Sequence, residues 1–209
     1  ANQISWHPDN SKLVYAAMGS YKRYNHYFDL WEYDFDTKKA QRLTTGERAR
    51  DPDYSPNGKS IVYVKGRHDA TDVLKIYDVE TKESRVITPS VPMGTRFANP
   101  RFSPDGRWIA VTSWDPVNMW KVYRYAVDGR SRRQRLTRAD RGMELRPVWL
   151  QDGVSILYSS DESGIPNIYR ANTITGKVER VTNVLTGAFE PTTYNGRDIY
   201  IQYLSLIHI

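Results

Sequence analysis

The residues with the greatest potential for catalysis are scattered through the chain. None of the histidines belongs to an HExxH zinc motif; they are His7, His26, His68 and His208. No GxSxG sequence is present, so the chain carries no nucleophile of the α/β-hydrolase type. Glu32, Asp34 and Asp36 look like a metal cluster. Asp78 and Glu80 recur at the matching place further on, which indicates turn chemistry instead. We expect no catalytic residue, no metal site and no cofactor.

A second group of polar side chains is suited to binding. Residues 18–27 contain Tyr21, Tyr24 and Tyr27, with a lysine, an arginine and a histidine between them. Tyrosine supplies a large contact area at a low cost in conformational entropy, so this segment predicts a surface for a protein or peptide partner. The alternative interpretation is that the three rings pack over a neighbouring part of the structure.

The elements that carry these residues are clearest in segment 99–137. Ser103-Pro104-Asp105-Gly106 has the residue types of a type I turn, with proline fixing φ at the second position. Residues 107–113 and 120–126 are rich in Val, Ile, Trp, Tyr and Thr, which is typical of strands. A fourth short strand ends at Leu136-Thr137. The segment therefore predicts a four-stranded antiparallel meander.

This unit recurs along the chain. The prolines that open it are separated by 48, 47 and 44 residues; they are Pro52, Pro100, Pro147 and Pro191. A period of about 40–50 residues with four strands is the signature of a β-propeller blade. We expect an all-β propeller with blades at about 1–45, 50–88, 98–137 and 145–182 and the start of a fifth at 189–203. Four aligned aromatic residues should be buried on the innermost strands: Trp6, Tyr54, Phe102 and Trp149.

The sequence resembles a known repeat family over nearly all of its length. FSPDGRWIAVTS, at 102–113, is close to the central pattern of the WD40-like PD40 repeats of TolB-type propellers, and Arg135-Leu136-Thr137 matches their typical blade end. Segments 43–52 and 182–191 resemble larger bacterial envelope proteins with TolB-like propellers, some of them fused to an outer-membrane barrel. The other copies depart from SPDG, and Trp114-Asp115 does not stand at a blade end as in WD40 proteins. The resemblance implies a fold more than an activity.

Strand alternation predicts which loops share a face. The SPDG-type turns lie on one face, together with the turns that join the third and fourth strands. Segment 18–27 lies on the other face with the longer loops that join successive blades. Binding usually resides on variable loops held by a rigid scaffold, so we expect the site on this second face.

The inner edge of the second face adds further candidates. We expect a ring of polar residues at the mouth of the central channel: Arg48, Arg50, Asp51, Arg96, Asn99, Glu144, Arg146 and Glu190. The alternative is a solvated, salt-bridged channel entrance without a ligand.

Basic residues are concentrated in the third unit. Residues 121–146 contain nine basic and three acidic residues, a net charge equal to the +6 of the whole chain. Such a cluster suggests nucleic-acid binding. The meander, however, places Arg130, Arg132 and Arg133 on one face and Arg138, Arg141 and Arg146 on the other. Because the run is split, we expect no nucleic-acid partner.

The ends of the chain suggest a fragment of a longer protein. The chain holds about four and a third units and does not begin with Met. It also contains no cysteine and no apolar run long enough to span a membrane. A signal peptide would lie upstream. Residues 204–209, LSLIHI, match the in-frame translation of a transposase adapter end used in sequencing libraries, so we expect a non-native tail. The alternative is a genuine alternating strand.

Two functions from different classes remain open. The first is a non-catalytic scaffold for protein or peptide binding in the bacterial cell envelope, periplasmic or secreted. The second is the gating propeller of a prolyl-oligopeptidase or tricorn-type peptidase whose catalytic domain lies outside this sequence. A downstream GxSxG in an α/β domain would indicate the peptidase, and alternating ten-residue strands a membrane barrel. The sequence indicates no oligomeric state.

Overall fold

Eighteen strands and no helix make up the part of the chain that the structure describes. The structure is a computed structural model, and it describes residues 4–22, 24–130, 132–137, 141–194 and 198–203. The turn expected at Asn195-Gly196 and the tail Leu204–Ile209 lie outside these residues. No described helix is long and apolar enough to cross a membrane.

The strands form five antiparallel sheets in chain order, which we call blades 1 to 5. Blade 1 contains β1 (Ile4–Trp6), β2 (Lys12–Tyr21), β3 (Asn25–Asp34) and β4 (Lys39–Arg42). Blade 2 contains β5 (Ala49–Tyr54), β6 (Ser60–Gly66), β7 (Asp72–Asp78) and β8 (Ser84–Val86). Blade 3 contains β9 (Arg96–Phe102), β10 (Trp108–Asp115), β11 (Met119–Ala126) and β12 (Gln134–Arg135). Blade 4 contains β13 (Glu144–Trp149), β14 (Ser155–Ser160), β15 (Asn167–Asn172) and β16 (Val178–Arg180), and blade 5 contains β17 (Ala188–Tyr194) and β18 (Asp198–Tyr203).

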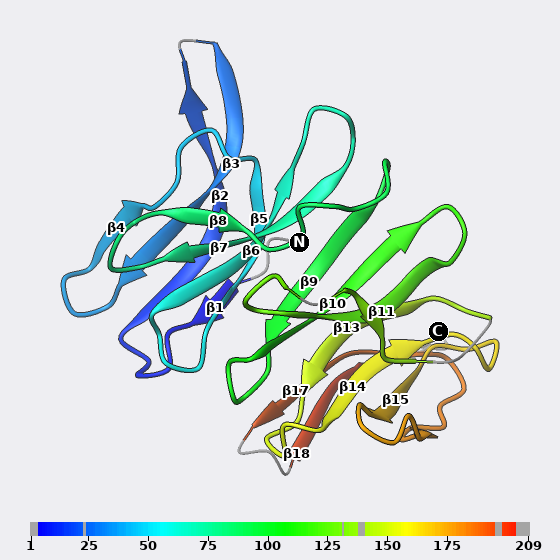
Figure 1. Cartoon of the computed structure of the whole chain (residues 1–209). Coiled ribbons are helices and arrows are strands. Elements are labelled where there is room, and N and C mark those ends of the chain that lie inside the picture. The colour runs from blue at the N-terminus through cyan, green and yellow to red at the C-terminus, as the bar shows by residue number, and fades with distance from the viewer. Residues whose placement is uncertain (1–3, 23, 131, 138–140, 195–197, 204–209) are drawn as a thin grey trace, which may run out of the picture.

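The blades are arranged side by side around a common centre (Figure 1). Blades 1 to 4 follow the order first, second, third, fourth strand, and blade 5 contains a first and a second described strand. The first strands contact one another: β1 with β5, β5 with β9, β9 with β13, and β13 with β17. The first strands are therefore the innermost ones. This arrangement confirms the predicted all-β propeller.

Turn chemistry explains why each unit forms a hairpin. In blade 3 the Gly106 N–H donates to the Ser103 carbonyl (2.8 Å), and Gly106 has a φ of 69°. The Asp105 carboxylate accepts from the Ser103 hydroxyl (2.5 Å) and from the Arg107 N–H (3.0 Å). Glycine at the fourth position permits the positive φ that L side chains rarely adopt.

The threonine at the blade end fastens the short fourth strand to the third. The Leu30 N–H donates to the Thr44 Oγ1 (2.9 Å), and the Leu43 N–H donates back to the Leu30 carbonyl (2.8 Å). Thr88 and Thr182 accept in the same way from the third strands of blades 2 and 4, at 2.8 and 2.9 Å. The pairs Leu43-Thr44, Ile87-Thr88 and Val181-Thr182 thus close blades 1, 2 and 4 through one side-chain and one backbone bond. In blade 3 the Val122 N–H donates to Glu144 instead.

Apolar residues between neighbouring blades form the core. One cluster joins Val14 and Leu30 of blade 1 to Ile61 and Tyr63 of blade 2, and similar clusters lie between blades 2 and 3, 3 and 4, and 4 and 5. Blades 2, 3 and 4 therefore each bury one face against the blade before and the other against the blade after, as stacked sheets must to cover both faces.

One of the four aligned aromatic residues departs from the prediction. Tyr54, Phe102 and Trp149 are buried, with 5, 8 and 6% of their surface exposed, but Trp6 is 49% exposed. The buried rings lie against the preceding blade; the Trp149 Nε1, for example, donates to the Arg101 carbonyl (3.1 Å). Among the described residues no sheet lies on that side of Trp6, whose ring stacks on Phe35 of its own blade (5.1 Å).

The inner strands begin earlier than the prolines that mark them, which corrects the predicted loop boundaries. The residue before each proline lies within a strand, has a positive φ and sits at a shift of strand register: Asp51 (52°), Asn99 (53°), Arg146 (56°) and Glu190 (51°). Such a β-bulge bends the strand and re-aims one side chain. The four candidates predicted to stand in loops at a channel mouth are therefore strand residues at a repeated bulge.

Candidate binding site

Segment 18–27, predicted to be a loop, is the end of a long hairpin. Strands β2 and β3 each have 10 residues and stay paired as far as Tyr21 and Asn25, so the hairpin projects beyond the other blades (Figure 1). The pairing continues beyond Met18 and Phe28 through Gly19 with Tyr27 and Ser20 with His26.

The three tyrosines of this hairpin have different surroundings. Tyr24 is 82% exposed near the tip. Tyr21 and Tyr27 pack against each other with ring centroids 5.5 Å apart. A Cβ added to Gly46 would lie 2.4 Å from the Tyr21 ring, so the ring rests directly on the loop that joins blades 1 and 2. Tyr21 and Tyr27 thus pack on the neighbouring loop, as the alternative interpretation expects, whereas most of the Tyr24 surface is exposed.

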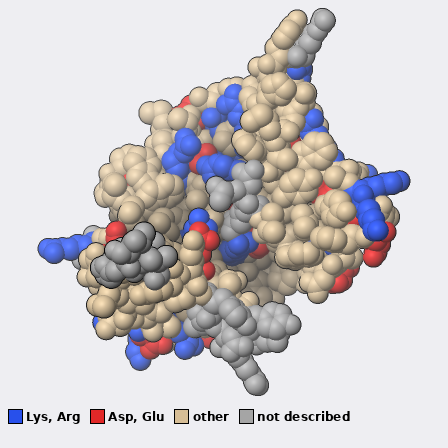
Figure 2. Space-filling view, turned by 180° about the vertical axis from the view of Figure 1, so that it is seen from behind, with Lys and Arg blue, Asp and Glu red and all other residues tan. Residues whose placement is uncertain are grey.

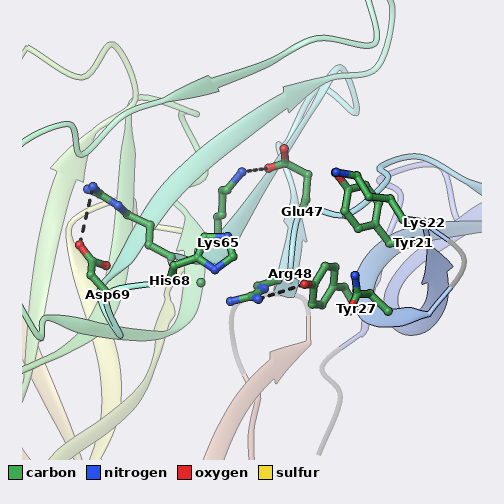
Figure 3. Close-up of a pocket in the computed structure, with 12 residues that line it drawn as sticks. Tyr21, Lys22, Tyr27, Glu47, Arg48, Lys65, His68 and Asp69 are labelled. Atoms are coloured by element: carbon green, nitrogen blue, oxygen red, sulfur yellow. Dashed lines mark hydrogen bonds and ion pairs between the residues drawn. The ribbon is translucent and has the colours of Figure 1, made fainter.

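A pocket of about 600 Å³ opens between this hairpin and blade 2 (Figure 3). Its walls are the hairpin, the loop between blades 1 and 2, and the loop that follows β6; the lining residues that matter below are Tyr21, Lys22, Tyr27, Glu47, Arg48, Lys65 and His68. The pocket is of the size that holds small ligands or single side chains of a partner. We call it the hairpin pocket.

Glu47 anchors the floor of the hairpin pocket. Its Oε2 accepts hydrogen bonds from Lys75 (2.8 Å) and the Tyr63 hydroxyl (3.1 Å) and lies 3.1 Å from the Lys65 Nζ. Burial by itself raises the pKa of this carboxyl, but the two lysines outweigh burial and lower the pKa below its usual value. Glu47 is therefore ionised and fully engaged.

Arg48 lies in the middle of the hairpin pocket with few partners. Its guanidinium stacks over the Tyr27 ring (4.5 Å to the centroid), and its Nη2 donates to the Tyr27 hydroxyl (3.2 Å). Within the described part of the chain, no Asp or Glu oxygen lies within 4.0 Å of it. The φ of Arg48 is 53°, a conformation that arginine seldom adopts.

The central cavity is a second polar site. It has a volume of about 620 Å³ and is lined by residues of five inner strands, among them Asn99, Arg146 and Glu190. The Arg146 Nη1 lies 2.9 Å from the Glu190 Oε1. Across the cavity Asp53 binds Arg101 (2.8 Å) and the Phe102 N–H (2.9 Å). In the rear view, basic and acidic side chains lie together around the middle of the molecule (Figure 2). The charges here are largely paired within the chain.

Asp51 and two of the predicted arginines hold blades 2 and 3 together. Asp51 accepts from the Asn99 N–H (3.3 Å). Arg50 donates to the Phe97 carbonyl (2.7 Å) and to the buried Asp72, and the Arg96 Nε lies 3.3 Å from the same Asp72 carboxylate. Both arginines therefore have a structural role between blades, outside the cavity at the centre.

Glu144 is the candidate that the structure removes from the channel mouth. Its side chain is completely buried between blades 3 and 4, where it accepts hydrogen bonds from the Val122 N–H (2.9 Å) and from the Thr137 hydroxyl. Burial raises the pKa of this carboxyl, despite these bonds and the nearby Lys121 and Arg135. The sequence prediction missed this because the innermost strand β13 begins at Glu144 itself.

The cationic segment 121–146 is spread over several environments. Lys121 is buried and donates to the Gly142 carbonyl (2.8 Å), Arg124 stacks on Trp108, and the Arg133 Nη1 lies 3.2 Å from the Asp115 Oδ2. Arg133, predicted to lie on the face of the Asp128-Gly129 turn, therefore reaches Asp115, which ends β10 on the other face, so these contacts do not establish the predicted split of the charges.

The residues that first suggested catalysis hold turns and strands together. His7 takes the place of the turn serine, with its Nδ1 2.6 Å from the Asp9 Oδ1. Asp34 accepts from the Thr37 N–H (2.7 Å), and Glu32 accepts from Lys12 (3.0 Å) and the Tyr54 hydroxyl. Across the described ranges, no group of three or more His, Cys, Asp or Glu could hold a metal ion.

Sequence reasoning included Lys22 in the predicted surface of segment 18–27 but missed Glu47, Lys65 and His68 as pocket residues. Lys65 lies in β6, whereas Glu47 lies in the loop between blades 1 and 2, and strand alternation alone does not show which strand side chains meet this loop. Comparing the loop before each inner proline gives the missing signal, because Arg48 and Arg96 both stand four residues before their proline.

Comparison with known proteins agrees with the observed architecture. A model of the family PD40, the TolB β-propeller domain, matches residues 10–202. The uncharacterized peptidase YuxL of Bacillus subtilis is 30% identical over 107 residues, which are 50% of this chain and 16% of that protein. An uncharacterized protein of Agrobacterium fabrum is 34% identical over 113 residues, 53% of this chain and 35% of that protein. The matched part thus spans well under half the length of either relative.

Solved structures with the same fold include proteins of different classes. The crystal structure of TolB from Acinetobacter baumannii has a TM-score of 0.71 at 24% identity, covering 94% of this chain and 47% of that one. A prolyl endopeptidase has a TM-score of 0.69 at 14% identity, covering 94% of this chain and 30% of that one. At these identities the similarity concerns the fold alone.

Proposed function

Because this chain belongs to the TolB β-propeller family, we propose that it is a non-catalytic scaffold that binds a protein or peptide partner in the bacterial cell envelope. The observation that carries the proposal is the hairpin pocket: a projecting hairpin with an exposed tyrosine stands beside a pocket of about 600 Å³ that contains stacked cationic side chains. Tyrosine and arginine are the residue types most enriched at the energetic centres of protein interfaces.

The location in the envelope is part of the same proposal. Its support is the family membership and the similarity to TolB structures from two bacteria. The absence of cysteine is compatible with an oxidising compartment.

Site-specific photo-crosslinking tests which face binds. A photoreactive amino acid replaces Tyr24 on the hairpin or Phe35 at the opposite end of the same blade, which is 40% exposed. Each variant is mixed with a bacterial envelope extract and irradiated, and the adducts are identified by mass spectrometry. We expect one specific adduct from position 24 and none of that identity from position 35. Equal adducts from both positions, or a specific adduct only from position 35, would contradict the proposal.

The gating propeller of a peptidase is the second candidate. The observation that favours it is the 30% identity to the uncharacterized peptidase YuxL over 107 residues. Sequencing the gene beyond the present ends decides between the two: a GxSxG motif in a downstream α/β domain supports the peptidase, whereas its absence from the complete gene excludes a serine peptidase of this type.

A further inference from the structure

Arg48 has a counterpart in the next blade. Arg48 and Arg96 stand four residues before Pro52 and Pro100, the prolines of two successive inner strands. Each therefore lies where the loop from the preceding blade enters the inner strand. The two arginines differ in what they bind.

Arg96 is used to bind a carboxylate. Its Nε lies 3.3 Å from the Asp72 Oδ2, and its Nη1 donates to the Ala70 carbonyl (3.1 Å). Asp72, 1% exposed, is the first residue of β7 in the preceding blade. An arginine in this position thus reaches the start of the third strand of the blade before it.

The matching carboxylate is missing from blade 1. Leu30 and Leu74 occupy equivalent positions, because each donates its N–H to the blade-end threonine, Thr44 or Thr88, at 2.9 or 2.8 Å. Two residues earlier, blade 2 has Asp72 and blade 1 has Phe28. The register therefore places a phenyl ring where Arg96 finds its aspartate.

The Arg48 guanidinium consequently has N–H groups without a described hydrogen-bond acceptor. A guanidinium has five N–H donors, and the described structure gives those of Arg48 one partner, the Tyr27 hydroxyl. The adjacent Glu47 is already held by Lys65, Lys75 and Tyr63. Lys22, at the rim of the same pocket, stacks over Tyr21 (5.5 Å) and has no Asp or Glu oxygen within 4.0 Å among the described residues. The hairpin pocket therefore contains two cations whose counter-charge the described chain does not supply.

We propose that the hairpin pocket binds a carboxylate of the partner, which Arg48 grips in place of the aspartate that Arg96 has within the chain. This inference rests on the proposed function and names the chemistry of the bound segment. Arginine is suited to this role because its planar fork matches a carboxylate with two parallel hydrogen bonds. Stacking on Tyr27 holds the fork in one orientation before binding, which lowers the entropy cost of association.

Short labelled peptides test the inference directly. A rhodamine-labelled tetraglutamate with an amidated C-terminus offers only side-chain carboxylates, tetraglutamine with a free C-terminus offers only the terminal one, and amidated tetraglutamine offers none. Binding is measured by fluorescence anisotropy at low ionic strength, where screening is weak. We expect at least one carboxylate peptide to bind more tightly than the amidated tetraglutamine. The stronger of the two identifies the source of the carboxylate.

Three variants assign the binding to Arg48. Arg48→Met, which introduces the residue found at the equivalent position in blade 4, should weaken binding about tenfold, the loss expected when a charged hydrogen-bonded pair is removed. Phe28→Asp should weaken it as well, because the new carboxylate occupies Arg48 from within the chain. Lys39→Gln, which removes one exposed cation from the opposite face, should leave affinity unchanged.

Several results would overturn the inference. Equal affinity for all three peptides excludes carboxylate recognition, and unchanged affinity of Arg48→Met excludes this pocket. If Phe28→Asp does not fold, as judged by its thermal melt, Arg48→Lys replaces it and should bind more weakly than the wild type because it keeps the charge but loses the fork. Crosslinking from position 24 is independent of these outcomes, so a partner that binds without a carboxylate would sustain the proposed function while refuting this inference.

Discussion

At the junction between blades 1 and 2 a residue of the third strand binds N–H groups of the connecting loop, whereas at the junction between blades 3 and 4 the residue at the same place binds carbonyl groups of the loop. The buried Asp29 accepts from the Gly46 and Glu47 N–H groups, both at 2.9 Å. At the equivalent position of blade 3, the buried Lys121 donates to the carbonyls of Arg141 (3.2 Å) and Gly142 (2.8 Å). The repeat thus conserves the place of the contact and not the sign of its charge.

Each junction also contains a glutamate, in a different setting. Where Asp29 holds the loop, Glu47 is drawn toward two lysines and its pKa is lowered. Where Lys121 holds it, Glu144 is enclosed between the blades and burial raises its pKa. The pockets above the junctions differ accordingly: one of about 600 Å³ contains Arg48, and one of about 350 Å³ contains Met143 at the equivalent position. The comparison shows that the repeated fold determines where a pocket forms, whereas the charged and apolar residues that line the pocket can differ from blade to blade.

The largest expected effect is that of Asp29→Ala. This change strips the buried carboxylate from Arg42 (2.6 Å), Thr44 (3.0 Å) and the two loop N–H groups. We expect the free energy of unfolding to fall by about 3–5 kcal/mol, because breaking a buried ion pair leaves its partners unsatisfied. Urea titration followed by tryptophan fluorescence measures this. A loss below about 1 kcal/mol would show that the loop is held by other contacts.

Two glycine substitutions test how rigidly each loop is packed. A Cβ at Gly142 would lie 2.7 Å from the Glu162 backbone nitrogen, whereas one at Gly46 would meet only the Tyr21 ring. Both glycines have positive φ, 76° and 73°. We expect Gly142→Ala to cost about 2–3 kcal/mol and Gly46→Ala about 1–2 kcal/mol, because a side chain can move and a backbone cannot. Thermal unfolding of both variants shows which substitution destabilises the protein more. A larger loss of stability in Gly46→Ala than in Gly142→Ala would contradict the comparison.

Glu47→Gln should remove a stabilising charge from the first junction. The loss at pH 7 is expected to be about 1–2 kcal/mol, in the range of charge-assisted hydrogen bonds. Because the folded-state pKa is lowered, this contribution is complete above the usual pKa of 4.5 and disappears as the pH falls below it. The difference between wild type and variant should therefore shrink on acidification, as denaturant titrations between pH 3 and 7 would reveal. A difference that grows instead would refute the assignment.

Glu144→Gln should show the opposite dependence on pH with the smallest effect. Since the folded-state pKa is raised above 4.5, the folded protein holds a proton more tightly than the unfolded chain. Wild-type stability from this group must then decrease as the pH rises from 4.5 through the folded-state pKa. The amide keeps an acceptor for the Val122 N–H, so we expect little change, within about 1 kcal/mol, near pH 4.5 and a gain relative to wild type at higher pH. If the free energies of unfolding of the wild type and the variant changed with pH in parallel, a raised folded-state pKa of Glu144 would be excluded.

Much of the fold could be predicted from the sequence, because strand period and turn residues are local. The hairpin at Ser103–Gly106 and the blade-end threonines follow from types and spacing alone. Trp6 was placed wrongly because its burial depends on a neighbouring blade, and Glu144 because a bulge shifts the start of the inner strand. Which charges meet between blades, as Glu47 and Lys75 do, depends on the angle between twisted sheets, which the sequence does not show.

The positive φ that recurs before each inner proline separates positions that determine stability from positions that are free to vary. Because the backbone itself turns the side chain at the bulge, the aromatic residue two positions beyond the proline is buried in blades 2, 3 and 4 whatever side chain occupies the bulge. Blade 5 has Thr193 at that position. Four blades accordingly carry Asp51, Asn99, Arg146 and Glu190 there, four different chemistries on one scaffold position. Single substitutions at the bulge position can thus change the wall of the central cavity without disturbing the core of a blade. Recognition and stability therefore depend on different positions of the same short motif.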